Sequence, residues 1–356
     1  MVAARYINKE LVLVFLVTLL VLLIVAVGGR FVGYLQDAAT GKYAAEGLLT
    51  LMRLRISGFL QLLLPFAFYI SVLLTFGRLY ADHEMTVLLA GGASPGRLLR
   101  WIALPVAILA SSVAYLALEV TPSNNAKLQA FILEQRNRAE FETVTPGVFN
   151  ILNRGKRVTY AERISDDRQT LSNVFISEYA PGEPVVTVWA ERGNQYVDEQ
   201  TGSRFLVLED GARYVGTIGS KDYRVIEFER LGQRLIVEEV VARGPEADAV
   251  ATMELLDRDD AEAAAEIHWR IALPIFCLVS VVLAVGIARV KPRQGRFAKV
   301  VPGMAFVLAY FFALIANQNA LLEAGWPPML GMWPVHVVFL ALGCFLFVRV
   351  GKPVNA

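Results

Sequence analysis

The sequence predicts a polytopic α-helical membrane protein, with six transmembrane helices in two groups of three and an all-β domain inserted between them. Three observations lead to this prediction. The 356 residues are 55% hydrophobic and only 19% charged, whereas soluble domains have about 25% charged residues. The hydrophobic residues are concentrated in blocks, each close to the roughly 20 residues that a helix needs to cross a bilayer. A charged, strand-patterned insert divides the chain into residues 1–120, 121–268 and 269–356.

The apolar blocks are the candidate transmembrane helices. The first block contains no charge and is followed by Arg30 rather than by a small-residue cleavage site. We therefore expect it to be a retained transmembrane helix and not a signal peptide. The six predicted spans are Leu11–Gly29, Ser57–Gly77, Trp101–Val120, Trp269–Ala288, Val300–Leu321 and Gly331–Val348.

Lysine and arginine residues near the span ends predict the orientation, because positively charged loops remain in the cytoplasm. The loop between the fourth and fifth spans contains basic residues and no acid, whereas the loop around Trp326 contains neither Lys nor Arg. Basic residues also lie near both termini, at Arg5, Lys9, Arg349 and Lys352. We therefore expect both termini to be cytoplasmic and residues 121–268 to be external. The basic loop residues are Arg289, Lys291, Arg293, Arg296 and Lys299.

Basic residues also flank the first two spans on the predicted external side, where they are normally sparse. They are Arg30, Lys42, Arg53 and Arg55. Long basic side chains that reach from the membrane surface toward water are one explanation. The other is a ring of cations that binds an anionic amphiphile, since the arginine fork fits phosphate oxygens.

Short runs of β-branched and aromatic residues, separated by Gly, Pro, Asn and Asp, fill most of the insert. Their spacing is typical of a sandwich or jelly roll rather than a parallel sheet. We expect helical linkers before the strands, through Lys127, Phe131 and Arg138, and after them, over Ala247–Glu266. The predicted strands are Val148–Leu152, Arg157–Ile164, Asn173–Tyr179, Val185–Glu191, Arg204–Leu208, Tyr223–Phe228 and Arg234–Val241.

The insert carries no group of residues typical of an active site. Its one histidine, His268, stands at its end, and its carboxylates are scattered. Cys277 and Cys344 lie in apolar blocks, and we expect them to be small core residues. The sequence therefore predicts no catalytic residue and no metal site, and a net charge of +1 argues against a nucleic-acid partner. A β domain of this size can bind a lipid between its layers or pair its edge with another protein.

The predicted cytoplasmic segment 78–100 contains a short amphipathic helix, from Arg78 to two glycines, Gly91 and Gly92. Gly91 and Gly96 have the spacing of the glycines in a phosphate-binding loop. However, Arg97 replaces the required Lys, Leu98 replaces Ser or Thr, and no strand precedes the loop. We therefore do not expect nucleotide binding in this chain.

The same segment is a candidate docking surface for a soluble partner. An exposed acid such as Glu84 can pair with an arginine of that partner. A surface ion pair contributes only about 0–1 kcal/mol, so we expect Met85, Val87 and Leu88 to supply most of the contact.

A series of short motifs runs through the whole chain in order. They are Gly29-Arg30-Phe31, Gly77-Arg78-Leu79-Tyr80, Glu84–Leu88 with Ala90 and Gly92, Glu140-Phe141 with Thr143, Pro146-Gly147 with Phe149, Trp269-Arg270 with Leu273-Pro274, and Lys291–Phe297. In residues and spacing this series resembles the LptF/LptG family of lipopolysaccharide export permeases, and the Glu84 and Pro292–Phe297 segments favour its F branch. Gly33 departs from the family, which has a further basic residue there, as does Ser123 in place of Gln.

The resemblance implies a non-enzymatic transmembrane subunit of an ATP-binding-cassette exporter in the inner membrane of a Gram-negative bacterium. Lipopolysaccharide would leave the outer leaflet of that membrane and pass through a periplasmic jelly roll toward a periplasmic bridge. The implied partners are an LptG-like permease, an LptB-like ATPase dimer that binds the ATP and magnesium, and an LptC-like periplasmic protein. No cofactor is implied in this chain itself.

The resemblance also assigns roles by position. The Glu84 segment corresponds to a coupling helix seated in the ATPase, and the first and fifth spans correspond to gate helices. The expected lipopolysaccharide contacts are Arg30, Lys42, Arg53, Arg55 and Arg270. The expected ATPase-coupling residues are Arg78, Tyr80, Glu84, Met85, Val87 and Leu88.

Two other classes of function compete with this interpretation. A mechanotransmission or sensory permease, whose external domain signals through residues 78–100, would need neither external cations nor a lateral gate. An intramembrane enzyme would need acids or histidines inside the spans. The predicted spans contain almost no acids or histidines; His336 lies near the external end of the sixth span. The neutral polar run Asn317-Gln318-Asn319 lies near the external end of the fifth.

Overall fold

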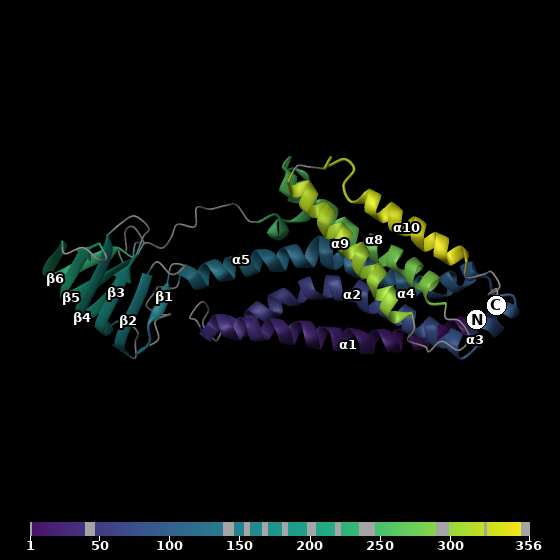
Figure 1. Ribbon diagram of the computed structural model, residues 1–356, viewed down its shortest axis with the longest axis horizontal. Helices are drawn as coiled ribbons and strands as arrows, with labels where there is room; N and C mark the ends of the chain where they lie inside the picture. The colour runs from purple at the N-terminus through teal and green to yellow at the C-terminus, as the bar shows by residue number, and fades with distance from the viewer. Residues whose placement is uncertain are drawn as a thin grey trace. The chain divides into compact units, whose positions relative to one another are not determined.

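The computed structural model describes residues 2–39, 47–137, 146–152, 157–165, 170–179, 184–197, 204–217, 222–234, 246–289, 299–323 and 326–349. The chain divides into two compact units (Figure 1). A helical unit comprises Met1–Gly29, Met52–Leu128 and Pro245–Ala356. A second unit, which contains the β-sheet, comprises Arg30–Leu51 and Gln129–Gly244.

Long apolar helices account for most of the helical unit. They are α1 (Val2–Ala39), α2 (Leu48–Ala81), α4 (Pro95–Tyr115), α8 (Ala261–Ile287), α9 (Val300–Leu322) and α10 (Trp333–Val348). The first five, with α4 counted together with its continuation, are long and apolar enough to cross a membrane. Helix α10 is apolar but has 16 residues. Five of the six predicted spans are therefore confirmed by length and composition, and the sixth stays a prediction.

The predicted linker before the strands is a continuation of α4. A π-helix, η2 (Leu116–Val120), joins α4 to α5 (Thr121–Asn137). Helix α5 confirms the predicted helical run through Lys127 and Phe131, whereas Arg138 lies outside the described residues. Such single π turns inside α-helices occur frequently at functional sites.

The predicted linker after the strands is wrong as a single helix. Residues Ala247–Glu266 form a 3₁₀ turn η4 (Ala247–Ala249), a short helix α7 (Thr252–Leu256) and the first turns of α8. Asp257, Asp259 and Asp260 lie between α7 and α8. They interrupt the helix because Asp side chains favour turns and N-caps over helix interiors. Asp260 caps α8 by accepting a hydrogen bond from the backbone N–H of Ala263 at 2.7 Å. This bond and Arg258 hold the pKa of Asp260 below its usual value.

Helix α8 is the central helix of this unit. In its most apolar 18-residue stretch 67% of the residues are buried, against 6% in α1. Aromatic rings pack around it: Phe276 on α8 lies 5.4 Å from Phe66 and 4.9 Å from Tyr310, between ring centroids. Cys277 is buried as expected, but Cys344 is exposed. The expectation for Cys344 is wrong because an apolar surface faces outward in a membrane protein, so hydrophobicity does not imply burial there.

One antiparallel sheet accounts for most of the described residues of the second unit, which also includes ends of α1, α2 and α5. Its strands are β1 (Asn150–Leu152), β2 (Arg157–Ile164), β3 (Thr170–Glu178), β4 (Val185–Val197), β5 (Arg204–Gly216) and β6 (Tyr223–Arg234). Each strand pairs with its neighbour in sequence, in the order β1-β2-β3-β4-β5-β6 (Figure 1). This meander lacks the Greek-key connection of a jelly roll, so the jelly roll is not confirmed among the described strands. The predicted strand Arg234–Val241 begins at the last residue of β6, and the rest of it lies outside the described residues.

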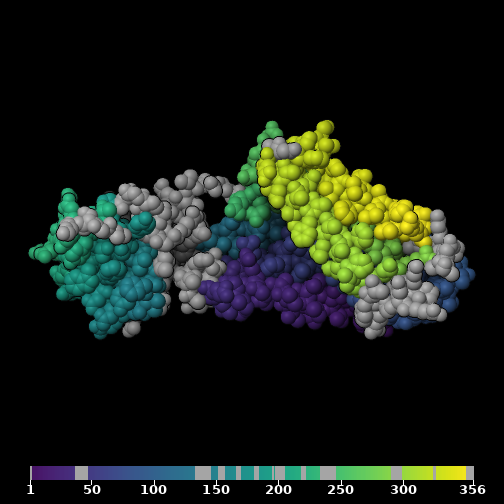
Figure 2. All heavy atoms as spheres, in the orientation of Figure 1, coloured from purple at the N-terminus to yellow at the C-terminus, as the bar shows by residue number. Residues whose placement is uncertain are grey.

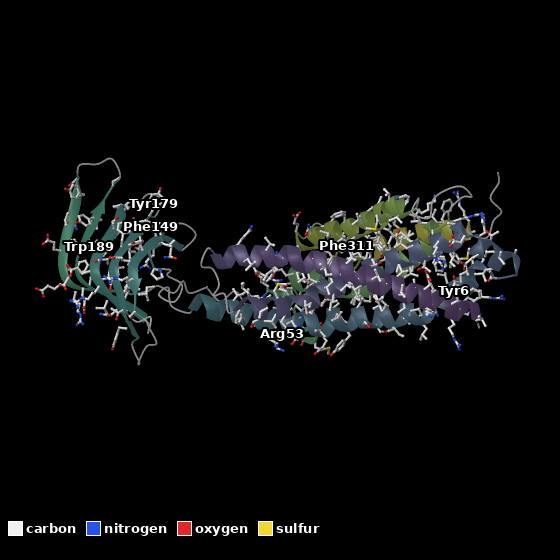
Figure 3. All side chains as sticks on the ribbon, turned by 90° about the horizontal axis from the view of Figure 1, so that it is seen from below. Tyr6, Arg53, Phe149, Tyr179, Trp189 and Phe311 are labelled. Atoms are coloured by element: carbon white, nitrogen blue, oxygen red, sulfur yellow. The ribbon has the colours of Figure 1, made fainter. Side chains whose placement is uncertain are left out.

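The two faces of the sheet differ. One face buries aliphatic side chains, among them Val174, Val188 and Leu208. On the other face Phe175 stands opposite both Tyr160 and Trp189 in the strand register, and Trp189 is 44% exposed (Figure 3). The alternation of inward aliphatic and outward aromatic side chains agrees with the period-2 pattern that predicted the strands.

Candidate functional site

The short helix α3 (Glu84–Ala90) lies between α2 and α4, at the end of the helical unit where α1 begins (Figure 1). His83 precedes it with φ 62°, a left-handed conformation, and Gly92 follows it with φ 87°. The predicted end at the two glycines is confirmed. The predicted start at Arg78 is wrong, because Arg78 lies in the last turn of α2 and the left-handed His83 separates the two helices.

The segment with phosphate-loop spacing runs from the end of α3 into α4. Ser94 caps α4 by accepting a hydrogen bond from the backbone N–H of Arg97 at 3.3 Å, and Pro95 occupies the first helical position. The Arg97 side chain donates to the carbonyl of Gly92 at 3.2 Å. A helix therefore precedes these glycines, where a phosphate-binding loop has a strand.

Arg78 is the centre of a polar group at this end, which we call the Arg78 cluster. Its guanidinium lies 3.1 Å from the carboxylate of Glu10 on α1 and 3.7 Å from that of Glu84 on α3. It also lies 3.5 Å from Asp82 and donates to the hydroxyl of Tyr6 at 2.8 Å. Tyr6 in turn donates to Glu84 at 3.3 Å. Three helices thus share one guanidinium, which is surrounded by three carboxylates.

Burial separates the predicted docking residues into two kinds. Met85 is fully buried and Tyr80 is 8% exposed, so both pack within the helical unit. Val87 is 69% exposed, and the Glu84 side chain is 37% exposed. Leu88 is half-buried. Of the predicted docking residues on α3, Glu84, Val87 and part of Leu88 are therefore accessible to another molecule, while the buried Met85 anchors the helix.

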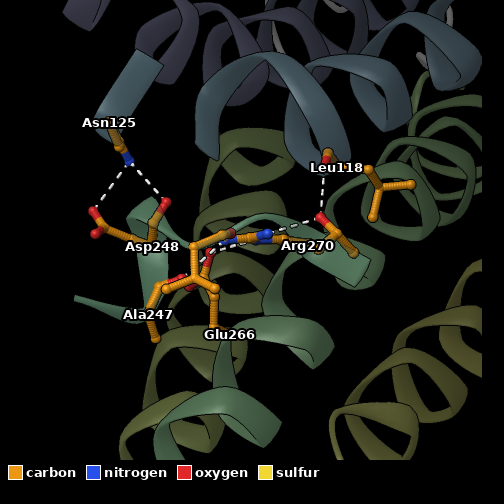
Figure 4. Close-up of polar contacts among 8 residues, drawn as sticks. Leu118, Asn125, Ala247, Asp248, Glu266 and Arg270 are labelled. Atoms are coloured by element: carbon orange, nitrogen blue, oxygen red, sulfur yellow. Dashed lines mark hydrogen bonds and ion pairs between the residues drawn. The ribbon is translucent and has the colours of Figure 1, made fainter. Parts of the chain in front are cut away.

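At the opposite end of the helical unit, Arg270 on α8 is the centre of a second polar group, which we call the Arg270 node (Figure 4). Only 1% of Arg270 is exposed. Its guanidinium lies 2.8 Å from the carboxylate of Glu266 and donates to the hydroxyl of Thr252 at 2.7 Å. It also donates to the carbonyls of Ala247 and Val250, both at 3.0 Å.

The node connects the segments that lead out of the helical unit with those that lead back in. The Thr252 hydroxyl donates to the carbonyl of Leu118 in the π-helix η2. The Asn125 amide on α5 donates to the carboxylate of Asp248 at 3.0 Å (Figure 4). Burial raises the pKa of Asp248 above its usual value, and the nearby Glu246 adds to this, while Arg55 and Arg270 oppose it.

A cavity of about 270 Å³ lies beside the Arg270 node. Both charged and aromatic residues line it, including Arg55, Phe59, Asp248 and Trp269. Arg55 lies 23 residues before Arg78 on α2, which corresponds to roughly 35 Å of helix at 1.5 Å per residue. The cavity and the Arg78 cluster are therefore at opposite ends of the helical unit.

Five basic residues were predicted from the sequence to contact lipopolysaccharide, namely Arg30, Lys42, Arg53, Arg55 and Arg270. Arg270 does not belong with the exposed ones, because its hydrogen bonds are made within the chain and it is buried. Arg53 is exposed (Figure 3) and Arg55 is half-buried. Arg30 is exposed, with its guanidinium carbon 5.3 Å from the ring centroid of Tyr34. Lys42 lies outside the described residues.

We refer to Arg30, Arg53 and Arg55 as the outer arginines. Arg30 belongs to the sheet-containing unit, whereas Arg53 and Arg55 belong to the helical unit. That the three act together stays a prediction.

Sequence reasoning missed several members of both polar groups. Tyr6 and Glu10 lie more than 60 residues from Arg78 in the chain, so only the packing of α1 on α2 brings them together. Glu266 and Arg270 were detectable, because an acid four residues before an arginine lies on the same helix face. Within the described residues, no group of three or more His, Cys, Asp or Glu could hold a metal ion.

Known proteins match this chain over nearly its whole length. The sequence pattern of the family described as lipopolysaccharide export system permease LptF/LptG matches residues 5–349. The permease LptF of Escherichia coli strain K12 is 27% identical over 350 residues, which cover 97% of this chain and 94% of that protein. The LptF proteins of Escherichia coli O157:H7 and Shigella flexneri show the same identity and coverage. The chain therefore belongs to the LptF/LptG family of lipopolysaccharide export system permeases.

Proposed function

We propose that this chain is a transmembrane subunit of an ATP-binding-cassette exporter that extracts lipopolysaccharide from the outer leaflet of the inner membrane. Family membership supports the cargo. The observation that supports the mechanism is the separation of two surfaces on one helical unit. A short helix with an exposed acid and an exposed valine lies at one end, and a cavity bordered by Arg55 lies roughly 35 Å away along α2.

The α3 end is the proposed docking site for an LptB-like ATPase dimer, and it faces the cytoplasm together with both termini. The Glu84 carboxylate already has Arg78 at 3.7 Å, yet more than a third of its side chain is exposed, so an arginine of the ATPase can approach it. Because such a pair contributes about 0–1 kcal/mol, Val87 and Leu88 are proposed to supply the apolar contact. ATP and magnesium are held by the ATPase, and this chain needs no cofactor of its own.

The opposite end is the proposed entry for the lipid. Arg53 and Arg55 lie at this end, and Arg30 and Lys42 of the other unit are proposed from the sequence to bind the same cargo. Their guanidinium and ammonium groups suit the phosphates of lipopolysaccharide, because arginine donates two parallel hydrogen bonds to such anions. Trp269 and Phe59 beside Arg55 add apolar surface to the cavity there. The sheet-containing unit is then the proposed periplasmic passage, and an edge of its sheet is proposed to meet an LptC-like protein.

The surface of the helical unit supports a second permease as partner. Helix α1 shows a row of exposed aliphatic side chains, including Leu13, Leu20 and Ile24, each more than half exposed. Figure 2 shows α1 and α9 on the surface of the helical unit. We propose that an LptG-like permease covers part of this surface and lipid the rest. Helix α10 completes the six spans.

Charge reversal at Glu84 tests the proposal. Glu84→Arg places a second cation beside Arg78 and opposite the proposed arginine of the ATPase, so the ATPase should no longer copurify with the permease pair. The matched control is Asp259→Arg, a reversal of an exposed acid near the other end of the unit. The readouts are copurification in mild detergent and ATP-driven transfer of lipopolysaccharide out of proteoliposomes that contain the whole complex.

The outcomes separate the candidate functions. Loss of copurification and of transfer with Glu84→Arg, but not with Asp259→Arg, supports the exporter. Normal transfer with Glu84→Arg contradicts the docking assignment. If the wild-type complex hydrolyses ATP in response to an external ligand but moves no lipopolysaccharide, the sensory permease is correct and the exporter is not.

A further inference from the structure

Helix α1 is held to the rest of the helical unit mainly near its first residues. Ile7 and Leu11 are its fully buried side chains in that unit, at 1% and 0% exposure. From Val12 to Val25 many aliphatic side chains are exposed, and only 6% of its most apolar stretch is buried. The tightly packed part of α1 is therefore the part that lies beside α3.

Polar contacts connect this end of α1 to α3 through α2. Arg78 on α2 binds Glu10 of α1 at 3.1 Å and Glu84 of α3 at 3.7 Å. Tyr6 of α1 provides a second connection, because its hydroxyl accepts from Arg78 at 2.8 Å and donates to Glu84 at 3.3 Å. A displacement of Glu84 thus acts on α1 by two routes, one through Arg78 to Glu10 and Tyr6, and one directly through the Tyr6 hydroxyl.

Apolar packing joins the same elements from the inside. Ile7 and Leu11 of α1, Leu79 of α2 and Met85 of α3 belong to one cluster of buried side chains, each at most 1% exposed. Closely packed side chains transmit displacement instead of absorbing it. The start of α1 therefore follows α3, while the exposed side chains from Val12 to Val25 oppose the movement little.

We propose that Arg78 is a positioning residue that transmits movement of α3 to α1. This inference rests on the proposed function, in which an ATPase binds α3, and assigns to Arg78 a role within the chain instead of contact with the ATPase. Three carboxylates surround the single guanidinium, so an arginine from the ATPase can join Glu84 while Arg78 keeps its contact with Glu10.

The test measures coupling separately from assembly. Arg78→Ala, Arg78→Lys and Glu10→Gln are compared in the complete complex reconstituted in proteoliposomes. Lys9→Ala is the matched control, because it removes a positive charge from an exposed residue next to Glu10. The measured quantities are ATPase copurified, ATP hydrolysed, and lipopolysaccharide transferred per ATP hydrolysed.

Arg78→Ala should leave the ATPase bound and active but lower the lipopolysaccharide transferred per ATP about fivefold, the lower end of typical coupling between sites. Glu10→Gln should also lower the lipopolysaccharide transferred per ATP. Its effect should be much smaller when Arg78 is already Ala, because both changes break the same contact between Arg78 and Glu10. Arg78→Lys should recover part of the ratio, since lysine keeps the charge but not the fork. Lys9→Ala should leave it unchanged.

Three results would overturn the inference. An unchanged ratio in Arg78→Ala means that movement reaches α1 by another route, and the proposed function then stands if Glu84→Arg still prevents docking. Effects of Arg78→Ala and Glu10→Gln that simply add show that the two residues act independently. Loss of bound ATPase in Arg78→Ala shows that Arg78 serves docking itself and not transmission.

Discussion

Replacement of Arg270 by alanine should destabilise the helical unit more than any other single loss of a described arginine in that unit. The change removes the partner of Glu266, which lies 2.8 Å away and has a side chain only 14% exposed. Removal of one partner from a buried ion pair costs about 3–5 kcal/mol, because the remaining charge stays buried without compensation. Solvent screening lowers this free-energy cost only slightly, because the Arg270 side chain is only 2% exposed.

The measurement is the free energy of unfolding in mixed detergent micelles, followed by circular dichroism as a denaturing detergent is added. Arg53→Ala is the control, because it removes an exposed arginine from the same unit and should change the free energy by less than about 0.5 kcal/mol. A double change of Arg270 and Glu266 to methionine removes both charges. It should recover much of the loss, as replacement of buried ion pairs by apolar residues does elsewhere.

The reasoning is refuted if Arg270→Ala is no more destabilising than Arg53→Ala. Arg270 would then be a cation that exchanges its partners readily. The sequence-based prediction that Arg270 contacts lipopolysaccharide would then stand again. If the double change is as unstable as Arg270→Ala alone, the stability comes from the hydrogen bonds to Thr252 and to the two carbonyls and not from the pair with Glu266.

Two further predictions concern the cargo and the core. Combined replacement of the outer arginines by alanine should reduce photocrosslinking of lipopolysaccharide to the complex, and unchanged crosslinking would favour the alternative that they only reach toward the membrane surface. Gly303→Ala on α9 should destabilise the helical unit by about 1–3 kcal/mol, because the new Cβ would lie 2.5 Å from Leu73 and 3.2 Å from the Tyr69 hydroxyl. Unfolding of the Gly303→Ala protein in a denaturing detergent checks this second prediction. An unchanged free energy of unfolding would mean that α9 and α2 can move apart without loss of stability.

The elements that the sequence predicted best are those whose signal is local. Residues Arg157–Ile164 form β2 with the predicted bounds, and the glycines end α3 as predicted. Strands β4, β5 and β6 are longer than predicted, since hairpin pairing extends them through polar residues of low strand propensity. Glu209, for example, continues β5 and pairs with Arg230 of β6 at 3.2 Å. Propensity describes how a side chain fits a half-buried surface, so pairing with a neighbouring strand overrides it.

The site was harder to predict because burial of charge depends on tertiary packing. Arg53 and Arg270 both stand near predicted span ends, and the sequence assigned them the same role. One is exposed, while the other is enclosed by η4, α7 and its own helix. The turn at Ala247–Val250 supplies two of the carbonyls, and the sequence predicted a continuous helix there, in which those carbonyls would have bonded to their own helix.

The two central arginines differ in exposure, and this difference assigns them different roles. Arg270 and Glu266 have side chains 2% and 14% exposed, so neither water nor a partner can replace their mutual contact, and the node is permanent while the unit is folded. Arg78 and Glu84 have side chains 26% and 37% exposed, so each contact of the cluster contributes little net free energy and can be exchanged. A structural joint requires the first property, and a surface that engages and releases a partner in every ATP cycle requires the second.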